Sequence, residues 1–269
     1  MCFTPAHTLL YALTLTGASV YSYRNPAPGK RLWVCAGWFA LMEWLQYLSY
    51  VILANDEYAQ YNKAITMMAY FQIAFQSFMI HYANGYVPAE MLRFIFLMGV
   101  SDLMMVVPIP GLAWNPDPNP YRYFAGTEWR TWQGAYHLAW SVPQTATTYY
   151  RPGITQFLSF FGPFVAVGKW KQAVGLLVTG PPMADWIVGG DVNQSASVWC
   201  FQSVVIAFVP IVKYSNLSRA RKVVAYIMFA CLLCYNYYLV WWLGAMRTTD
   251  SPHTSHPFPT CLLTAQSAR

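Results

Sequence analysis

Long apolar runs alternate with short polar turns along most of this chain. The runs predict helices over residues 5–23, 32–53, 64–82, 91–113, 153–168, 172–189, 197–212 and 223–246. Gly180, Pro181 and Pro182 interrupt the sixth run. Apolar runs of this kind are typical of helices that cross a bilayer. The pattern therefore predicts an all-α fold, a polytopic transmembrane helical bundle with seven core helices plus an additional C-terminal helix.

The predicted organisation has three parts. Residues 1–213 form a seven-helix membrane domain with an outer cap segment at 114–152, and residues 214–246 form the additional transmembrane helix. Residues 247–269, rich in Ser, Thr and Pro, form a disordered tail. In the cap segment, Trp132, Tyr136 and Trp140 recur at spacings of four. That spacing predicts an amphipathic helix over 129–150, which lies in the outer leaflet or packs on the bundle as a lid.

Composition and charge agree with a membrane location. Of the 269 residues, 57% are hydrophobic and only 10% are charged, whereas a soluble domain carries about 25% charged residues. The net charge is +6, but the basic residues lie singly or in short groups between apolar runs, so we expect no nucleic-acid partner. Ten of the 16 Lys and Arg residues fall in one set of alternate loops and six in the other, which predicts both termini on the outer side. The predicted partner is the lipid bilayer.

Acidic and amide residues inside apolar runs are the candidates for function. A charge at bilayer depth costs about 2.5–3.5 kcal/mol, so it usually faces a cavity or a partner. Glu43 and Gln46 share one face of the second helix, Gln72 and Gln76 share one face of the third, and Asp102 lies midway along the fourth. These five residues predict a polar site for a small ligand, an ion or a proton. The alternative is hydrogen bonding that only orients the helices.

Two carboxyl groups inside one bundle would influence each other. We expect Glu43 and Asp102 to face the bundle interior and to approach one another or a shared cavity. Burial and like charge would then raise the pKa of at least one of them.

Four further residues are placed at an outer mouth of the bundle: His137, Trp140, Asp185 and Asn193. His137 is the predicted pH-responsive group there. Asp185 follows the Gly-Pro-Pro interruption, which is either a half-helix start that attracts anions or a simple proline kink. Asn193 begins a glycosylation triplet in a predicted outer loop.

The sequence specifies no cofactor. Histidines are few, and none pairs at a ligand spacing, which argues against a metal or a haem. The seventh helix has no interior lysine, which argues against a retinal Schiff base. Cys231 and Cys234 lack a second pair of ligands, so we interpret them as packing residues.

Segments at 1–2, 37–46, 70–78, 137–143 and 192–200 together resemble an uncharacterised family of multi-pass membrane proteins, a domain of unknown function. The likeness spans residues 1 to about 213, and the eighth helix and the tail look like an addition. The family's third-helix motif is similar to His-Ile-Ala-Phe-Gln-Pro, and here Gln72 and Ser77 stand at the His and Pro positions. The resemblance supports a seven-helix unit and implies no activity. It draws attention to Glu43, Gln46, Gln76, His137 and Asn193.

Three functions remain open at this point. The first is an integral membrane protein, transporter-like or channel-like, with an intramembrane polar site in helices 2–4. The second is an accessory subunit of a larger membrane complex, such as an organellar one, whose other subunits dock on the aromatic eighth helix. The third is a membrane-embedded enzyme acting on lipid, against which the sparse histidines argue. A binding or transport protein is therefore favoured over an enzyme.

Overall fold

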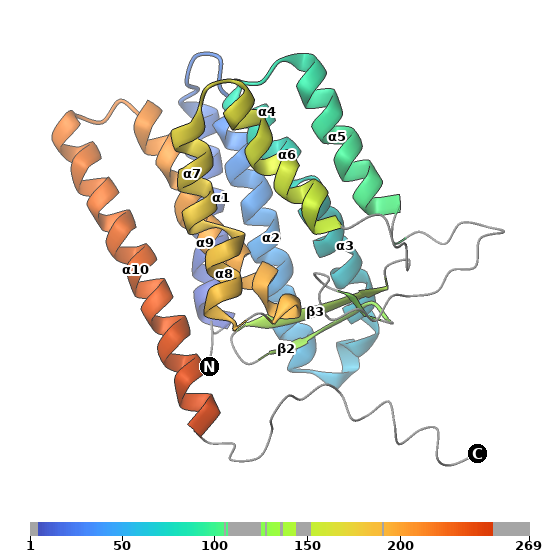
Figure 1. Ribbon diagram of the computed structural model, residues 1–269. Helices are drawn as coiled ribbons and strands as arrows, with labels where there is room; N and C mark the ends of the chain where they lie inside the picture. The colour runs from blue at the N-terminus through green and yellow to red at the C-terminus, as the bar shows by residue number, and fades with distance from the viewer. Residues whose placement is uncertain are drawn as a thin grey trace, which may run out of the picture.

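Ten α-helices, one 3-10 helix and three short strands make up the described chain (Figure 1). The computed structural model describes residues 5–104, 106, 125–126, 128–134, 137–143, 152–189 and 191–249. The first helices are α1 (Pro5–Arg24), α2 (Leu32–Leu53), the 3-10 helix η1 (Asp56–Tyr61), α3 (Asn62–Ala74), α4 (Gln76–Asn84) and α5 (Ala89–Met104). The strands are β1 (Ala125–Gly126), β2 (Arg130–Gln133) and β3 (Leu138–Pro143). The last helices are α6 (Pro152–Ala166), α7 (Trp170–Thr179), α8 (Pro181–Ile187), α9 (Val192–Tyr214) and α10 (Arg219–Thr249).

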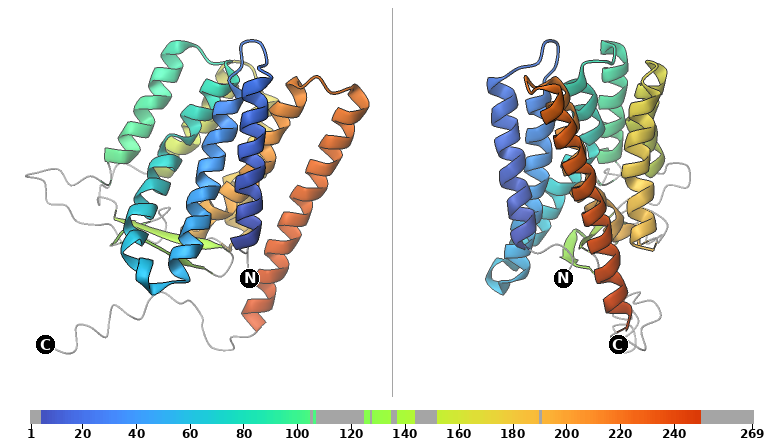
Figure 2. Two further views of the ribbon diagram at one scale, coloured as in Figure 1. Left: turned by 180° about the vertical axis from the view of Figure 1, so that it is seen from behind. Right: turned by 90° about the vertical axis from the view of Figure 1, so that its left-hand side faces the viewer.

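Helix α2 lies at the centre of the bundle and packs against α1, α3, α4 and α9. Its bounds coincide with the predicted helix at 32–53, because Pro26, Pro28 and Gly29 precede it and a polar turn follows. Close packing with α1 is possible because Gly37 faces Ser19. Helix α10 lies on the outside of the bundle, inclined beside α9 (Figure 2).

The predicted helix at 64–82 is two helices, α3 and α4, which are separated at Phe75. Phe75 leaves helical geometry with φ −100° and ψ 6°. Its neighbour across the interface is Gly99 of α5. A Cβ atom on Gly99 would lie 2.8 Å from the carbonyl oxygen of Ala74 and 2.9 Å from the Phe75 ring. The break is therefore fitted to a close approach of α5 that only glycine permits.

We expect Gly99→Ala to destabilise the protein by about 1–3 kcal/mol, because its methyl group overlaps backbone at the α3–α4 junction. The matched control is Gly17→Ala in α1, where a Cβ meets nothing within 4 Å. Better helix propensity predicts a gain of up to about 1 kcal/mol for that variant. Urea unfolding of both variants measures whether each substitution lowers or raises the free energy of unfolding. Equal stabilisation of the two would contradict the close packing at Gly99.

A three-stranded sheet closes one end of the bundle, opposite the loops α1–α2, α4–α5 and α6–α7 (Figure 1). The strand order is β1-β3-β2, with β3 parallel to β1 and antiparallel to β2. Two hydrogen bonds fix β2 to α3: the Asn62 side chain accepts from the Thr131 N–H and donates to its carbonyl, both at 2.8 Å. On β3, Trp140 and Val142 enter a core shared with α2 and α3.

The described chain is mostly helical, as predicted, with this small sheet as an exception to the all-α class, and the predicted amphipathic helix over 129–150 is wrong because residues 130–133 and 138–143 are strands. Thr131 pairs with Trp140 and Trp132 with Ala139 in the antiparallel register, so Trp132 and Trp140 lie on different strands. The spacing of four came from a hairpin whose turn includes Gly134. A Cβ on Gly134 would lie 2.3 Å from the Gln194 side chain, so a larger residue here would displace Gln194. Tyr136 lies outside the described residues.

The predicted polytopic transmembrane bundle is also corrected. Within the described part of the chain, none of the helices is both long enough and apolar enough to cross a membrane. Crossing needs about 20 apolar residues. The helices α3, α4, α5, α6, α7 and α8 are shorter than that. Of the predicted disordered tail at 247–269, residues 247–249 belong to the end of α10, and residues 250–269 lie outside the described residues.

Candidate functional site: buried polar groups along α2, α3 and α4

Glu43 and Gln46 are buried on one face of α2, with 1% and 0% of their surfaces exposed. Phe39, Glu43, Gln46 and Tyr50 follow one another at spacings of four, three and four, so they form one stripe of the helix. Within the described residues, neither oxygen of the Glu43 carboxyl and neither amide atom of Gln46 has a hydrogen-bond partner. Buried polar groups are nearly always paired, so this pair of side chains requires an explanation.

Gln72 is held by a reciprocal pair of hydrogen bonds between α3 and α2. Its side-chain amide donates to the Trp38 carbonyl at 2.9 Å, and the Trp38 indole donates to the Gln72 carbonyl at 3.0 Å. The two residues therefore lie at the same level of the bundle. The side-chain oxygen of Gln72 is buried without a partner among the described residues.

The level of Gln72 fixes where the other candidates lie, because α2 and the α3–α4 pair run in opposite directions (Figure 1). At about 1.5 Å per residue, Glu43 lies roughly 8 Å from Trp38 toward the sheet. Gln76 lies roughly 6 Å from Gln72 toward the other end. Glu43 and Gln46 thus share one turn, whereas Gln76 is distant from both. The candidate residues therefore form a column of polar groups along the bundle interior instead of the predicted single cluster.

The upper part of this column is formed by α4 and α6. The Ser159 hydroxyl donates to the Ser77 hydroxyl at 3.0 Å, and Gln76 beside it is fully buried with both amide atoms unpartnered in the described chain. The Nε2 atom of His81 lies 3.0 Å from the Ser159 carbonyl and 3.1 Å from the Phe160 carbonyl. Because both partners are acceptors, Nε2 carries the proton.

The lower end of the column is Tyr50 of α2 and His137 beside β3. The Tyr50 hydroxyl lies 2.9 Å from Nδ1 of His137, and the two rings stack with centroids 5.9 Å apart. The Leu138 N–H also donates to Nδ1, at 2.7 Å, so Nδ1 is an acceptor. The His137 N–H donates to the Gln194 side chain at 3.3 Å. His137 and Trp140 are therefore buried where the sheet meets the bundle.

Asp102 is buried on α5, which packs against α3, α4 and α6. Its carbonyl accepts a hydrogen bond from the Tyr70 hydroxyl at 3.1 Å. Glu43 and Asp102 are both buried in the interior, as expected. Glu43 lies on α2 and Asp102 on α5, and α3 packs against both of these helices.

Asp185 and Asn193 lie on α8 and α9. The side chain of Asp185 is outside the described part of the structure. Asn193 is in the first turn of α9, where its N–H donates to the capping Asp191 carboxylate at 3.0 Å. Ser195 of the same triplet is buried. The glycosylation triplet thus lies in a helix, and the predicted loop is wrong.

Burial dominates the electrostatics of the column. It raises the pKa of Glu43 from 4.5 to about 8, so this carboxyl is protonated at neutral pH. It lowers the pKa of His137 to about 3 and that of His81 to about 4, the latter against two backbone hydrogen bonds that oppose the change. Burial thus brings the pKa of Glu43 near neutral pH and takes that of His137, the predicted pH-responsive group, far below it.

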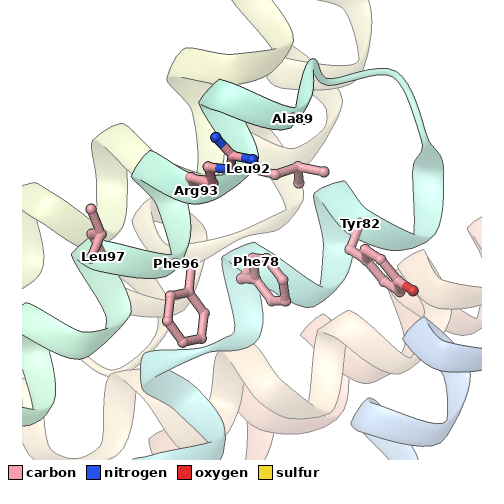
Figure 3. Close-up of a pocket in the computed structure, with 7 residues that line it drawn as sticks. All are labelled: Phe78, Tyr82, Ala89, Leu92, Arg93, Phe96 and Leu97. Atoms are coloured by element: carbon pink, nitrogen blue, oxygen red, sulfur yellow. The ribbon is translucent and has the colours of Figure 1, made fainter.

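A separate hollow of about 520 Å³ lies on the outer surface between α4 and α5 (Figure 3). Its lining is almost wholly apolar: Phe78, Tyr82, Ala89, Leu92, Arg93, Phe96 and Leu97. None of these residues belongs to α2 or α3, so the hollow is not part of the polar column. Among the described residues no group of three or more His, Cys, Asp or Glu side chains could hold a metal ion.

Sequence reasoning did not find Tyr50, Ser77 or Ser159. Tyr50 follows Glu43 by seven residues, which places it on the same helical face, and that spacing was the available signal. Ser77 and Ser159 are 82 residues apart, and a single small hydroxyl in an apolar run carries no comparable signal.

The comparisons with known proteins identify the family of the chain. The model of a "Family of unknown function (DUF5765)" matches residues 6–241. The chain belongs to this family. The match of DUF5765 runs past residue 213 into α10, so most of the predicted additional helix is part of the family's common sequence. No curated protein and no solved structure matches the chain.

Proposed function

We propose that this DUF5765 protein binds a small monovalent cation at Glu43 and Gln46 in exchange for the proton of Glu43. The observation that supports the proposal is the buried carboxyl group without a hydrogen-bond partner among the described residues. An ionised carboxylate in such a place is strongly disfavoured unless a positive charge accompanies it. A proton meets this requirement when the site is empty, and a cation meets it when the site is filled.

The neighbouring groups are suitable ligands for such an ion. The side-chain oxygen of Gln46, one turn from Glu43, is also without a partner in the described chain. Carboxylate and amide oxygens are the ligands that hard cations prefer. One carboxylate supplies one negative charge, so a monovalent ion leaves the site neutral, whereas a divalent ion would leave a buried positive charge. When the cation binds, the Glu43 O–H bond breaks and the proton leaves to solvent.

Exchange of a proton for a cation predicts that the cation lowers the apparent pKa of Glu43. Infrared difference spectroscopy of the protonated carboxyl, titrated in NaCl, KCl and choline chloride at equal ionic strength, measures this. We expect the pKa to fall in NaCl or KCl relative to choline chloride. The fall is about one unit when the ion is tenfold above its dissociation constant.

Three variants make the assignment specific. Glu43→Gln removes the titrating band, and Gln46→Leu keeps the band but weakens the effect of the cation. Glu90→Gln, at an exposed carboxylate of α5, is the matched control and changes neither. A band that titrates identically in all three salts would exclude cation exchange and would leave Glu43 as a site for a proton alone.

A further inference from the structure

The end of the bundle opposite the sheet is strongly basic. The loops α1–α2, α4–α5, α6–α7 and α9–α10 meet at this end (Figure 1), and all four lie within the described residues. Ten basic residues lie in or beside them: Arg24, Lys30, Arg31, Arg93, Lys169, Lys171, Lys213, Arg219, Arg221 and Lys222. Glu90 is the one acidic residue among the described positions there.

Three of these lysines converge on two tyrosines. The Nζ atom of Lys30 lies 3.5 Å from the centroid of the Tyr86 ring, and that of Lys169 lies 5.3 Å from the same ring. The Nζ atoms of Lys213 and Lys30 lie 5.2 and 5.7 Å from the Tyr214 ring. The two tyrosine hydroxyls are hydrogen-bonded to each other, which joins the two halves of the cluster. The lysine–tyrosine cluster thus collects residues from four separate segments of the chain.

The backbone beneath the cluster is fixed before any ligand arrives. The Arg31 N–H donates to the Ala83 carbonyl at 2.9 Å, and the Lys30 ammonium donates to the Asn84 carbonyl. Gly85 has φ +59°, and a Cβ there would lie 2.6 Å from the Gly29 carbonyl oxygen. These contacts join the α1–α2 and α4–α5 loops. A positively charged site that is already assembled binds an anion without the entropy loss of ordering loops.

The positive charges of the cluster are not neutralised. No carboxylate of the described chain lies within ion-pair distance of Lys30, Lys169 or Lys213, and the Glu128–Arg130 pair is at the sheet end. Burial, together with repulsion from Lys213 and Lys169, lowers the pKa of Lys30 against the attraction of Tyr214. Burial favours a raised pKa for Tyr214, but its bond with Tyr86 and the charges of Lys213 and Lys30 lower the pKa overall. An anion placed between the ammonium groups would relieve their repulsion.

We propose that the lysine–tyrosine cluster binds the phosphate group of a phosphate-bearing ligand. Three ammonium groups beside one hydrogen-bonded pair of tyrosines match a compact anion of about two negative charges, and lysine binds phosphate as a mobile point charge. Lys169 and Lys213 are exposed, so their ammonium groups can move onto a ligand, while Lys30 is held in place. A nucleic acid would require a row of such sites. The Tyr86 and Tyr214 pair supplies hydroxyl groups that can also contact phosphate oxygens.

The first experiment measures the binding of inorganic pyrophosphate to the full chain by isothermal titration calorimetry, with sodium chloride at matched ionic strength as the reference. We expect saturable binding that Lys169→Gln and Lys213→Gln each weaken by roughly tenfold, the loss for one charge-assisted contact. Both positions are exposed, so these variants keep the fold.

Two control variants separate the cluster from general positive charge. Lys171→Gln removes an exposed charge two residues from Lys169, where the ammonium lies over Trp170 instead of the tyrosines. Lys63→Gln removes one from α3 at the sheet end. Neither is expected to change the affinity. Equal losses in all four variants, or pyrophosphate heats no larger than those of sodium chloride, would overturn the proposal.

The phosphate group can come from a soluble ester or from a lipid headgroup. Flotation with phosphatidylcholine vesicles that contain a phosphatidylinositol phosphate, against pure phosphatidylcholine vesicles, distinguishes the two sources. Binding that depends on Lys169 and Lys213 in this assay indicates a lipid headgroup. Pyrophosphate binding without any flotation indicates a soluble ligand. Flotation that Lys169→Gln and Lys213→Gln leave unchanged would exclude the cluster as the lipid site.

Discussion

The free energy of unfolding is expected to pass through a maximum near pH 6.5 and to fall on both sides of it. On the alkaline side the cause is Glu43, whose pKa rises from 4.5 to about 8 on folding. Between these values the folded state holds a proton that the unfolded state has lost. Stability therefore declines as the pH rises toward 8, by about 1 kcal/mol for each pH unit.

On the acid side, the two buried histidines reverse the sign of the pH dependence, so that the free energy of unfolding rises with pH. Their pKa values fall from 6.5 to about 4 for His81 and about 3 for His137, so the unfolded state takes up two protons as the pH drops below 6.5. Glu43 offsets one of these protons down to about pH 4.5. Between pH 4.5 and 6.5 the unfolded state therefore binds about one more proton than the folded state. The free energy of unfolding falls by about 1 kcal/mol for each pH unit as the pH drops.

Glu43→Gln isolates the first of these contributions. The variant is expected to keep its stability from pH 6.5 to 9, while its acid limb becomes twice as steep because the offsetting proton is gone. Urea unfolding followed by tryptophan fluorescence across pH 4.5–9 measures both limbs, with the exposed Glu90→Gln as the control. An alkaline limb that survives in Glu43→Gln would show that another group titrates there.

Phe160→Ala is expected to lower the free energy of unfolding by about 3–5 kcal/mol. Phe160 is 1% exposed and lies in the largest buried cluster, where its ring meets Trp199 edge-on with centroids 4.8 Å apart. The cluster joins α1, α2, α4, α6, α7, α8 and α9, so the cavity left by the ring cannot collapse without moving several helices.

The matched control for this variant lies two residues away on the same helix. Leu158 is 57% exposed, so Leu158→Ala is expected to change stability by no more than about 0.5 kcal/mol. Denaturant titration compares the two variants. A loss for Phe160→Ala similar to that for Leu158→Ala would contradict the burial of the Phe160 ring against Trp199.

The sequence predicted the helices best where local signals and tertiary structure agree. For α2, turn-forming residues bound an apolar run, and the predicted and observed limits are the same. The break at Phe75 was not predicted, because phenylalanine does not interrupt helices. Its cause is the close approach of Gly99, a residue 24 positions later. Such a contact is invisible until the two helices are placed side by side.

The sequence also predicted which polar residues are buried, but not how they are arranged. A charged or amide side chain within an apolar run must be enclosed, and Glu43, Gln46, Gln72, Gln76 and Asp102 all are. Their levels depend on the register between antiparallel helices, which the Trp38–Gln72 hydrogen bonds set. The lysine–tyrosine cluster depends on the meeting of four loops, and no spacing of residues along the chain predicts it.

The strand β3 has a consequence for the order in which the chain folds. Its neighbour His137 bonds to Tyr50, 87 residues earlier, and to Gln194, 57 residues later. Contacts of such long sequence separation form late, because each must close a long loop. During synthesis, α2 emerges well before α9, and the sheet end stays open to water in the interval. While water reaches Glu43 its carboxyl group is ionised at neutral pH, so it takes up its proton from solvent as the sheet closes over the interior and burial raises its pKa.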